Sequence, residues 1–92
     1  MEGVQQLMRE AIHFVQEDSY DLAEEAYALA LEKSSLELGE NDRTTVSILG
    51  HLGRVCLCQG SDDKIDLATS LLQRQLFAYE KTPQLQTLLP ER

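Results

Sequence analysis

Four side chains are of the types that carry out acid–base, nucleophilic or metal chemistry: His13, His51, Cys56 and Cys58. A histidine moves protons near neutral pH, and a cysteine becomes a nucleophile when a neighbouring base lowers its pKa. A simpler interpretation exists for each of them. The histidines suit a surface or a groove, and Cys56 occupies a position where a small core residue is expected.

The spacing of these residues falls short of a metal site. Cys58 and His51 are seven positions apart, which is two turns along one helix face, but Cys56 points in another direction. A tetrahedral zinc site needs more ligands than these. The two cysteines, two positions apart on a helix, cannot form an ordinary disulfide with each other. We predict no catalytic site, no metal and no cofactor, so the chain is not expected to be an enzyme.

Helices must position any other functional residues. Apolar residues recur at steps of three and four in four segments of the chain, which is typical of amphipathic helices: 4–17, 20–38, 43–59 and 63–80. The connections between these segments are short, so successive helices should pack antiparallel. In the last segment the stripe expected to be buried consists of Ile65, Ala68, Leu71, Leu72, Leu76 and Tyr79.

The residues between the segments favour helix ends. Asp18 or Ser19 can cap the second helix, because either side chain accepts a hydrogen bond from an unpaired backbone N–H. Asn41 or Asp42 can cap the third helix in the same way. Glycines follow the second and third helices, where a left-handed residue is common.

A degenerate motif occurs twice in the chain. Its first copy consists of Leu7, Ala11, Phe14, Tyr20, Ala23, Tyr27 and Ala30. Its second copy consists of Leu49, Leu52, Gly53, Cys56, Gly60, Ile65, Ala68 and Leu72. Ala11 and Gly53 take the same place, 42 residues apart. Self-similarity at a fixed spacing is typical of repeat proteins.

These residues resemble a tetratricopeptide repeat over about positions 4–81. The spacing is longer than usual, and Leu38-Gly39 precedes a polar turn, as in the longer repeats of kinesin light chains. The resemblance implies an all-α fold of four main helices: two antiparallel helical hairpins in a right-handed superhelical array. It divides the chain into two repeats within 1–82 (about 4–40 and 43–82), and leaves 83–92 as a C-terminal lid or flexible tail.

The second copy departs from the first in two places. Asp62-Asp63-Lys64 are three extra residues in its hairpin turn, and Gln75 takes the position of Ala30. We therefore expect the last helix to pack differently at Gln75.

Charge excludes some partners. The 16 acidic and 8 basic side chains give a net charge of −8, which disfavours binding to a nucleic-acid backbone. The charge is uneven: residues 1–42 hold 11 acidic and 2 basic side chains, and residues 43–92 hold 5 and 6. No apolar run is long enough to span a bilayer, and the N-terminus lacks a secretory pattern. We predict a cytoplasmic protein with no membrane or nucleic-acid partner.

The tetratricopeptide resemblance also implies a concave groove, lined by the first helix of each hairpin, that holds a partner segment. Carried over by position, the groove residues are Gln5, Arg9, Ile12, Gln16, Ser47, His51, Arg54 and Cys58. Arg9 and Arg54 can each hold a carboxylate through two aligned N–H donors, which favours an acidic partner segment. Alternatively, both arginines are solvated or pair with neighbouring glutamates.

Two functions follow as expectations. The first is a non-enzymatic protein–protein interaction module, or adaptor, that binds a protein or peptide segment in the groove. The alternative is a self-assembling scaffold subunit, or a fragment of a longer array, whose repeat ends form the interface. Val4, Leu7 and 85–89 are the candidates for apolar surface at those ends, and a homo-oligomer would follow.

Overall fold

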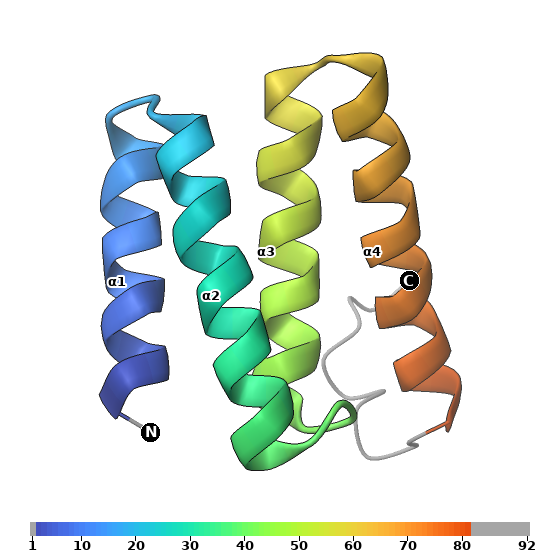
Figure 1. Cartoon of the computed structure of the whole chain (residues 1–92). Coiled ribbons are helices and arrows are strands. Elements are labelled where there is room, and N and C mark those ends of the chain that lie inside the picture. Colours follow the sequence, from blue (N-terminus) through green and yellow to red (C-terminus); the bar gives the residue numbers. More distant parts are fainter. Residues whose placement is uncertain (1, 82–92) are drawn as a thin grey trace, which may run out of the picture.

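The computed structural model describes residues 2–81, without the side chain of Glu2, and these residues form helices and no strand. The helices lie side by side in chain order: α1 (Glu2–Gln16), α2 (Tyr20–Leu38), α3 (Arg43–Gln59) and α4 (Asp62–Lys81) (Figure 1). Each helix packs against the next in the opposite direction. The predicted all-α fold of two helical hairpins is confirmed. The superhelical handedness and the repeat boundaries stay predictions, and the proposed lid at 83–92 lies outside the described residues.

The polar turns place the helix ends close to the predicted positions. At the start of α3, the Asp42 carboxylate accepts a hydrogen bond from the Thr44 N–H at 2.9 Å, which confirms one of the two predicted caps. At the start of α2 the prediction of a side-chain cap is wrong. Ser19 takes the N-cap position without a side-chain capping bond, and Asp18 accepts from the Tyr20 hydroxyl instead. Asp18 has a φ of +61°, so the backbone turn itself directs its side chain away from the helix end.

Gly39 and Gly60 follow α2 and α3 with positive φ values of +98° and +76°. Side chains other than glycine rarely adopt this region of φ, because Cβ approaches the backbone. Each glycine N–H donates to the carbonyl four residues earlier, Ser35 and Cys56 respectively. The chain therefore reverses directly after each helix, and the next helix packs alongside.

All four helices contribute to one hydrophobic core. Its buried residues are Val4, Ala11, Ala23, Ala26, Tyr27, Ala30, Ile48, Leu49, Leu52, Val55, Cys56, Ala68 and Leu71. Val4 is fully buried, so the prediction that it forms exposed surface at the repeat end is wrong. As the first apolar residue of α1, it packs into the core, whereas Leu7 is only partly buried against it.

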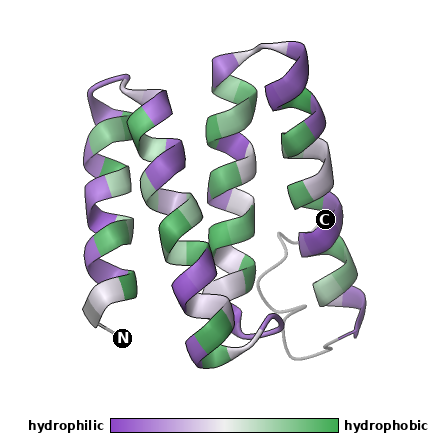
Figure 2. Cartoon of the chain, viewed as in Figure 1, coloured by the Kyte–Doolittle hydropathy of each residue, from purple (hydrophilic) through white to green (hydrophobic). Residues whose placement is uncertain are grey.

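The buried stripe of α4 is narrower than predicted. Ala68, Leu71 and Tyr79 are buried, but Ile65 is 41% exposed and Leu76 is 54% exposed. Among the described helices, α4 packs mainly against α3 and stands at the end of the row (Figure 1). In Figure 2 the ribbon of α3, which has a neighbour on both sides, carries more of the green of apolar residues than the ribbon of α4. A helix covered on one side buries only the residues that face that side.

Contacts between α2 and α3 join the two hairpins. The Tyr27 ring stacks on the His51 ring with centroids 5.6 Å apart and planes 12° apart. About two turns away on each helix, the Ser34 and Thr45 hydroxyls share a hydrogen bond of 2.6 Å, and both residues are fully buried. A buried hydroxyl without a partner is costly, so this pair favours one relative position of the two helices.

Glu24 of α2 binds two residues of the second hairpin, one on each side of the turn between α3 and α4. Its carboxylate accepts hydrogen bonds from the Gln59 amide at 2.7 Å and from the Lys64 ammonium at 2.6 and 2.8 Å. Burial acts to raise the pKa of the Glu24 carboxyl, but the hydrogen bonds from Lys64 and Gln59 outweigh it and hold the pKa below its usual value. Glu24 therefore stays charged near neutral pH and holds the two hairpins together.

Glycines allow α3 and α4 to approach closely. A Cβ added at Gly53 would lie 3.0 Å from the Leu72 side chain, which explains a glycine inside a helix. A Cβ added at Gly50 would lie 2.5 Å from the Gln75 amide. That amide occupies the space and donates to the Val46 carbonyl at 3.1 Å. The expected difference in packing at Gln75 is thus a hydrogen bond between helices, where the first hairpin has the small residue Ala30.

Candidate protein-binding groove

The eight predicted groove residues lie on α1 and α3, the first helix of each hairpin. Ser47 and His51 are half-buried, and the exposed members of the set are Gln5, Arg9, Ile12, Gln16, Arg54 and Cys58. Since none is buried, all eight side chains can meet a partner.

A hollow of about 340 Å³ lies between α1 and α3. It brings together Gln5 and Ser47, two of the predicted residues, with Met8, Arg43 and Thr44. The two helices are separated in sequence by the whole of α2, so this hollow exists only because the hairpins are stacked. Its volume is at the lower end of the range of small-molecule pockets, about 300–1,000 Å³, and can also take one or two side chains of a peptide.

A second hollow, of about 240 Å³, lies between α3 and α4. It is lined by Ser47, Gly50, His51, Arg54, Gln75 and Tyr79. Ser47 lines both hollows, so they meet at this residue and cross α3 from α1 to α4. We call this combined surface the basic groove.

The two hollows take in only part of the predicted set. Arg9, Ile12, Gln16 and Cys58 line neither of them, although all four are exposed on the same two helices. Arg43 lines the first hollow and is absent from the predicted set. The sequence could have predicted Arg43 as a groove residue. It comes four residues, about one turn, before Ser47 and therefore lies on the same helix face.

The charge of α3 contrasts with that of the whole chain. The sequence of α3 contains Arg43 and Arg54 and no aspartate or glutamate, within a protein of net charge −8. Arg9, Arg43 and Arg54 are all exposed. Among the side chains that the structure describes, none of the three forms an ion pair, whereas Lys64 pairs with Glu24. Pairing of Arg9 and Arg54 with neighbouring glutamates is therefore not seen in this part of the chain.

His51 lies between the core and the basic groove. Burial against neighbours that include the Tyr27 ring lowers the pKa of the imidazole below its ordinary value, and the positive charge of Arg54 lowers it further. The imidazole is consequently neutral at pH 7 and disfavours protonation in the folded state.

This shift predicts a loss of stability in mild acid. The unfolded chain binds a proton at His51 near pH 6.5, and the folded chain does so only at a lower pH. The free energy of unfolding therefore falls as the pH drops below about 6.5, until the folded pKa is reached. Urea unfolding at about pH 7.5 and about pH 5.5 measures the difference.

The substitution His51→Gln should reduce the pH dependence of the free energy of unfolding. The matched control is His13→Gln, at an exposed position of α1, which should leave that dependence unchanged. A pH dependence that is unchanged by His51→Gln would contradict the assignment.

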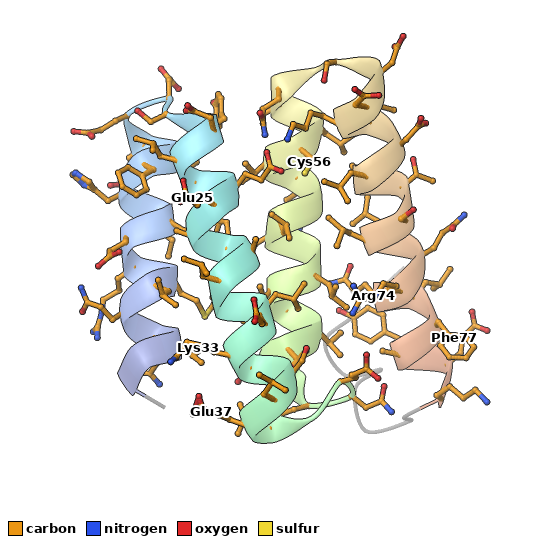
Figure 3. All side chains as sticks on the ribbon, in the orientation of Figure 1. Glu25, Lys33, Glu37, Cys56, Arg74 and Phe77 are labelled. Atoms are coloured by element: carbon orange, nitrogen blue, oxygen red, sulfur yellow. The ribbon has the colours of Figure 1, made fainter. Side chains whose placement is uncertain are left out.

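The cysteines differ in their surroundings. Cys56 is fully buried (Figure 3), as expected for a small core residue, and burial raises the pKa of its thiol, which makes it a poor nucleophile. Cys58 is exposed on α3. Within residues 2–81 no three side chains of histidine, cysteine, aspartate or glutamate gather in a group that could hold a metal ion.

A larger hollow lies elsewhere, between the α2–α3 turn and α4. It has a volume of about 660 Å³ and includes Arg74 and Phe77, both labelled in Figure 3. No predicted groove residue lines it. The guanidinium of Arg74 lies 3.9 Å from the Glu40 carboxylate, so this basic side chain already has an acidic neighbour.

No family model, curated protein or solved structure matches this chain. None of the helices in residues 2–81 is both long and apolar enough to cross a membrane. The tetratricopeptide resemblance therefore rests on the repeated residues alone.

Proposed function

We propose that this chain is a tetratricopeptide-like, non-enzymatic adaptor whose basic groove binds an acidic segment of a partner protein. The stacked hairpins support the family resemblance, because the small residues Ala11, Ala23 and Ala68 of the motif are all fully buried where helices meet. We further propose a cytoplasmic setting, which the two free cysteines support, since reducing compartments keep thiols unpaired.

One observation carries the proposal: three exposed arginines, Arg9, Arg43 and Arg54, without ion pairs among the described side chains of an acidic protein. Arginine is suited to bidentate recognition of carboxylates. The hollow that contains Arg43 is continuous through Ser47 with the one that contains Arg54, so an extended peptide could contact both. The acidic remainder of the protein would repel the same peptide elsewhere and so favour this one site.

Charge reversal tests the groove. The double substitution Arg43→Glu and Arg54→Glu, at the two arginines that line the groove, should weaken binding of labelled extended peptides rich in aspartate and glutamate by at least about tenfold. An exposed ion pair contributes up to about 1 kcal/mol, and reversal adds repulsion. Fluorescence anisotropy at low salt measures the affinity, and far-UV circular dichroism checks the fold. Arg74→Glu, outside the groove, is the matched control. Equal binding by the folded double variant would exclude the groove model.

Self-assembly is a second candidate because α4 leaves apolar side chains exposed at the end of the row. Leu76 is 54% exposed and Phe77 is 61% exposed. Stacked repeats usually cover such a surface with a neighbouring repeat. Light scattering distinguishes the two candidates: a mass of 10.4 kDa at all concentrations favours the adaptor, and a mass that grows with concentration favours assembly.

A further inference from the structure

A second groove lies on the first hairpin, between α1 and α2. It holds about 240 Å³, and its apolar part includes Leu7, Phe14, Leu22 and Leu29. Leu22 and Leu29 are 44% and 48% exposed, although both are large apolar residues inside a helix. Exposed apolar surface that gathers in one place, unlike scattered single residues, is typical of interaction sites. We call this surface the edge groove.

The internal repeat shows what covers the equivalent surface of the second hairpin. With a shift of 42 residues for the first helix, Leu7, Glu10 and Phe14 correspond to Leu49, Leu52 and Cys56. With the three extra turn residues, the shift for the second helix is 45, and Ala26 corresponds to Leu71. Four of the seven groove positions therefore have equivalents that are at most 4% exposed: Leu49, Leu52, Cys56 and Leu71. The equivalents of Leu22, Glu25 and Leu29, which are Leu67, Ser70 and Arg74, stay exposed.

The helix α2 lies beside that equivalent surface. It packs against α3, and its residues Ala23, Tyr27 and Ala30 belong to the same buried cluster as the four residues of the second hairpin. The occupant that the fold places on this kind of surface is thus an α-helix with mostly small apolar residues on one face. The edge groove shares the four covered positions, so it suits a helix of the same kind, and the exposed residues Leu22, Glu25 and Leu29 of α2 also line it.

The rim of the edge groove determines the charge of the occupant. Glu10 and Glu25 line it and are both exposed, and Figure 3 labels Glu25 on α2. Their equivalents in the second hairpin, Leu52 and Ser70, are uncharged, so the acidic rim is particular to the first hairpin. Residues 1–42 carry a net charge of −9, which attracts a basic partner. A second copy of this chain, at −8, is repelled.

We propose that the edge groove docks an amphipathic helix of a partner protein, with a stripe of alanine and leucine flanked by lysine or arginine. Its apolar stripe covers Leu22 and Leu29, and its basic side chains pair with Glu10 and Glu25. Lys64 and Glu24 form such a pair where the second hairpin meets α2. The site has the opposite charge to the basic groove, so one small chain can join two different partners.

The test uses labelled helical peptides of about five turns, with one alanine and leucine stripe and either lysine or glutamate flanks. The full chain should bind the lysine peptide and not the glutamate peptide in fluorescence anisotropy. Leu22→Glu should weaken binding at least about tenfold, because it removes apolar surface that the peptide covers and places a charge under the apolar stripe. The matched control is Leu67→Glu, at the equivalent position of α4 and 39% exposed, which should leave the affinity unchanged.

A charge exchange makes the result specific. Glu25→Lys should weaken binding of the lysine peptide and strengthen binding of the glutamate peptide. The basic-groove variant, Arg43→Glu with Arg54→Glu, should not weaken binding of the lysine peptide. Two binding results would overturn the proposal: no binding of the lysine peptide to the wild type, or equal affinity of the wild type and Leu22→Glu for it. Two further results would also overturn it. The third is a wild-type dimer that Leu22→Glu dissociates, and the fourth is tighter binding of the lysine peptide after removal of residues 82–92. The third result assigns the groove to a second copy, and the fourth to the chain's own end.

Discussion

Tyr27→Ala is expected to lower the free energy of unfolding by about 3–5 kcal/mol, the usual cost of removing a buried aromatic ring. Tyr27 is 3% exposed on α2, and its ring stacks on His51 of the second hairpin. The substitution leaves a cavity where the hairpins meet. A domain of this length has a total stability of about 5–14 kcal/mol, so the loss is a large part of it. Urea denaturation followed by far-UV circular dichroism measures the change.

Tyr27→Phe is the matched control for this loss. It keeps the ring and its stacking on His51, and removes a hydroxyl for which no hydrogen bond is found among the described residues. The expected loss is therefore below about 1 kcal/mol. If Tyr27→Ala were as stable as Tyr27→Phe, the ring would not contribute to joining the hairpins.

Gly53→Leu is expected to cost about 3 kcal/mol, because overpacking forces neighbours out of position. Even the first atom of the new side chain would lie 3.0 Å from Leu72, and the Ala68 carbonyl oxygen is at 3.7 Å. Leucine forms helices better than glycine, so helix propensity acts in the opposite direction and the loss reports on packing. Thermal and urea unfolding of the variant against the wild type give the value.

Two further variants separate packing from other causes. Gly53→Ala should change stability little, because the gain in helix propensity of about 1 kcal/mol offsets the close contact with Leu72. Adding Leu72→Ala to Gly53→Leu should restore part of the loss by making room for the new side chain, a coupling that a double-mutant cycle measures. Without such rescue, the close approach of α3 and α4 would not explain this glycine.

The sequence predicted the helices well because their ends depend on nearby residues. The predicted second and third helices, 20–38 and 43–59, have the observed bounds, and the other two differ by at most two residues. Gly39 and Gly60 end helices through their own φ values, and Asp42 caps α3 within two residues of itself. Ser19 shows the limit of this reasoning, because a capping residue type does not guarantee the capping geometry.

The groove was predictable only in part. The tetratricopeptide resemblance assigned Ser47, His51 and Arg54 to the groove, and the structure brings these three together in one hollow. The contribution of Gln75 and Tyr79 depends on how α4 lies against α3, which no spacing within one helix can specify. Arg43 was missed because it was assigned to the start of the helix and not to its face.

The sequence by itself determined the four helices, the two hairpins, the acidic first half and the small residues that let helices approach. Only the tertiary structure decided which apolar residues are covered. It buries Val4 and leaves Leu76 exposed, although both fit a helical stripe. It also stacks Tyr27 on His51, a pair 24 positions apart, and so lowers the histidine pKa. The physical reason is that helix formation depends on neighbours along the chain, whereas burial and pKa depend on neighbours in space.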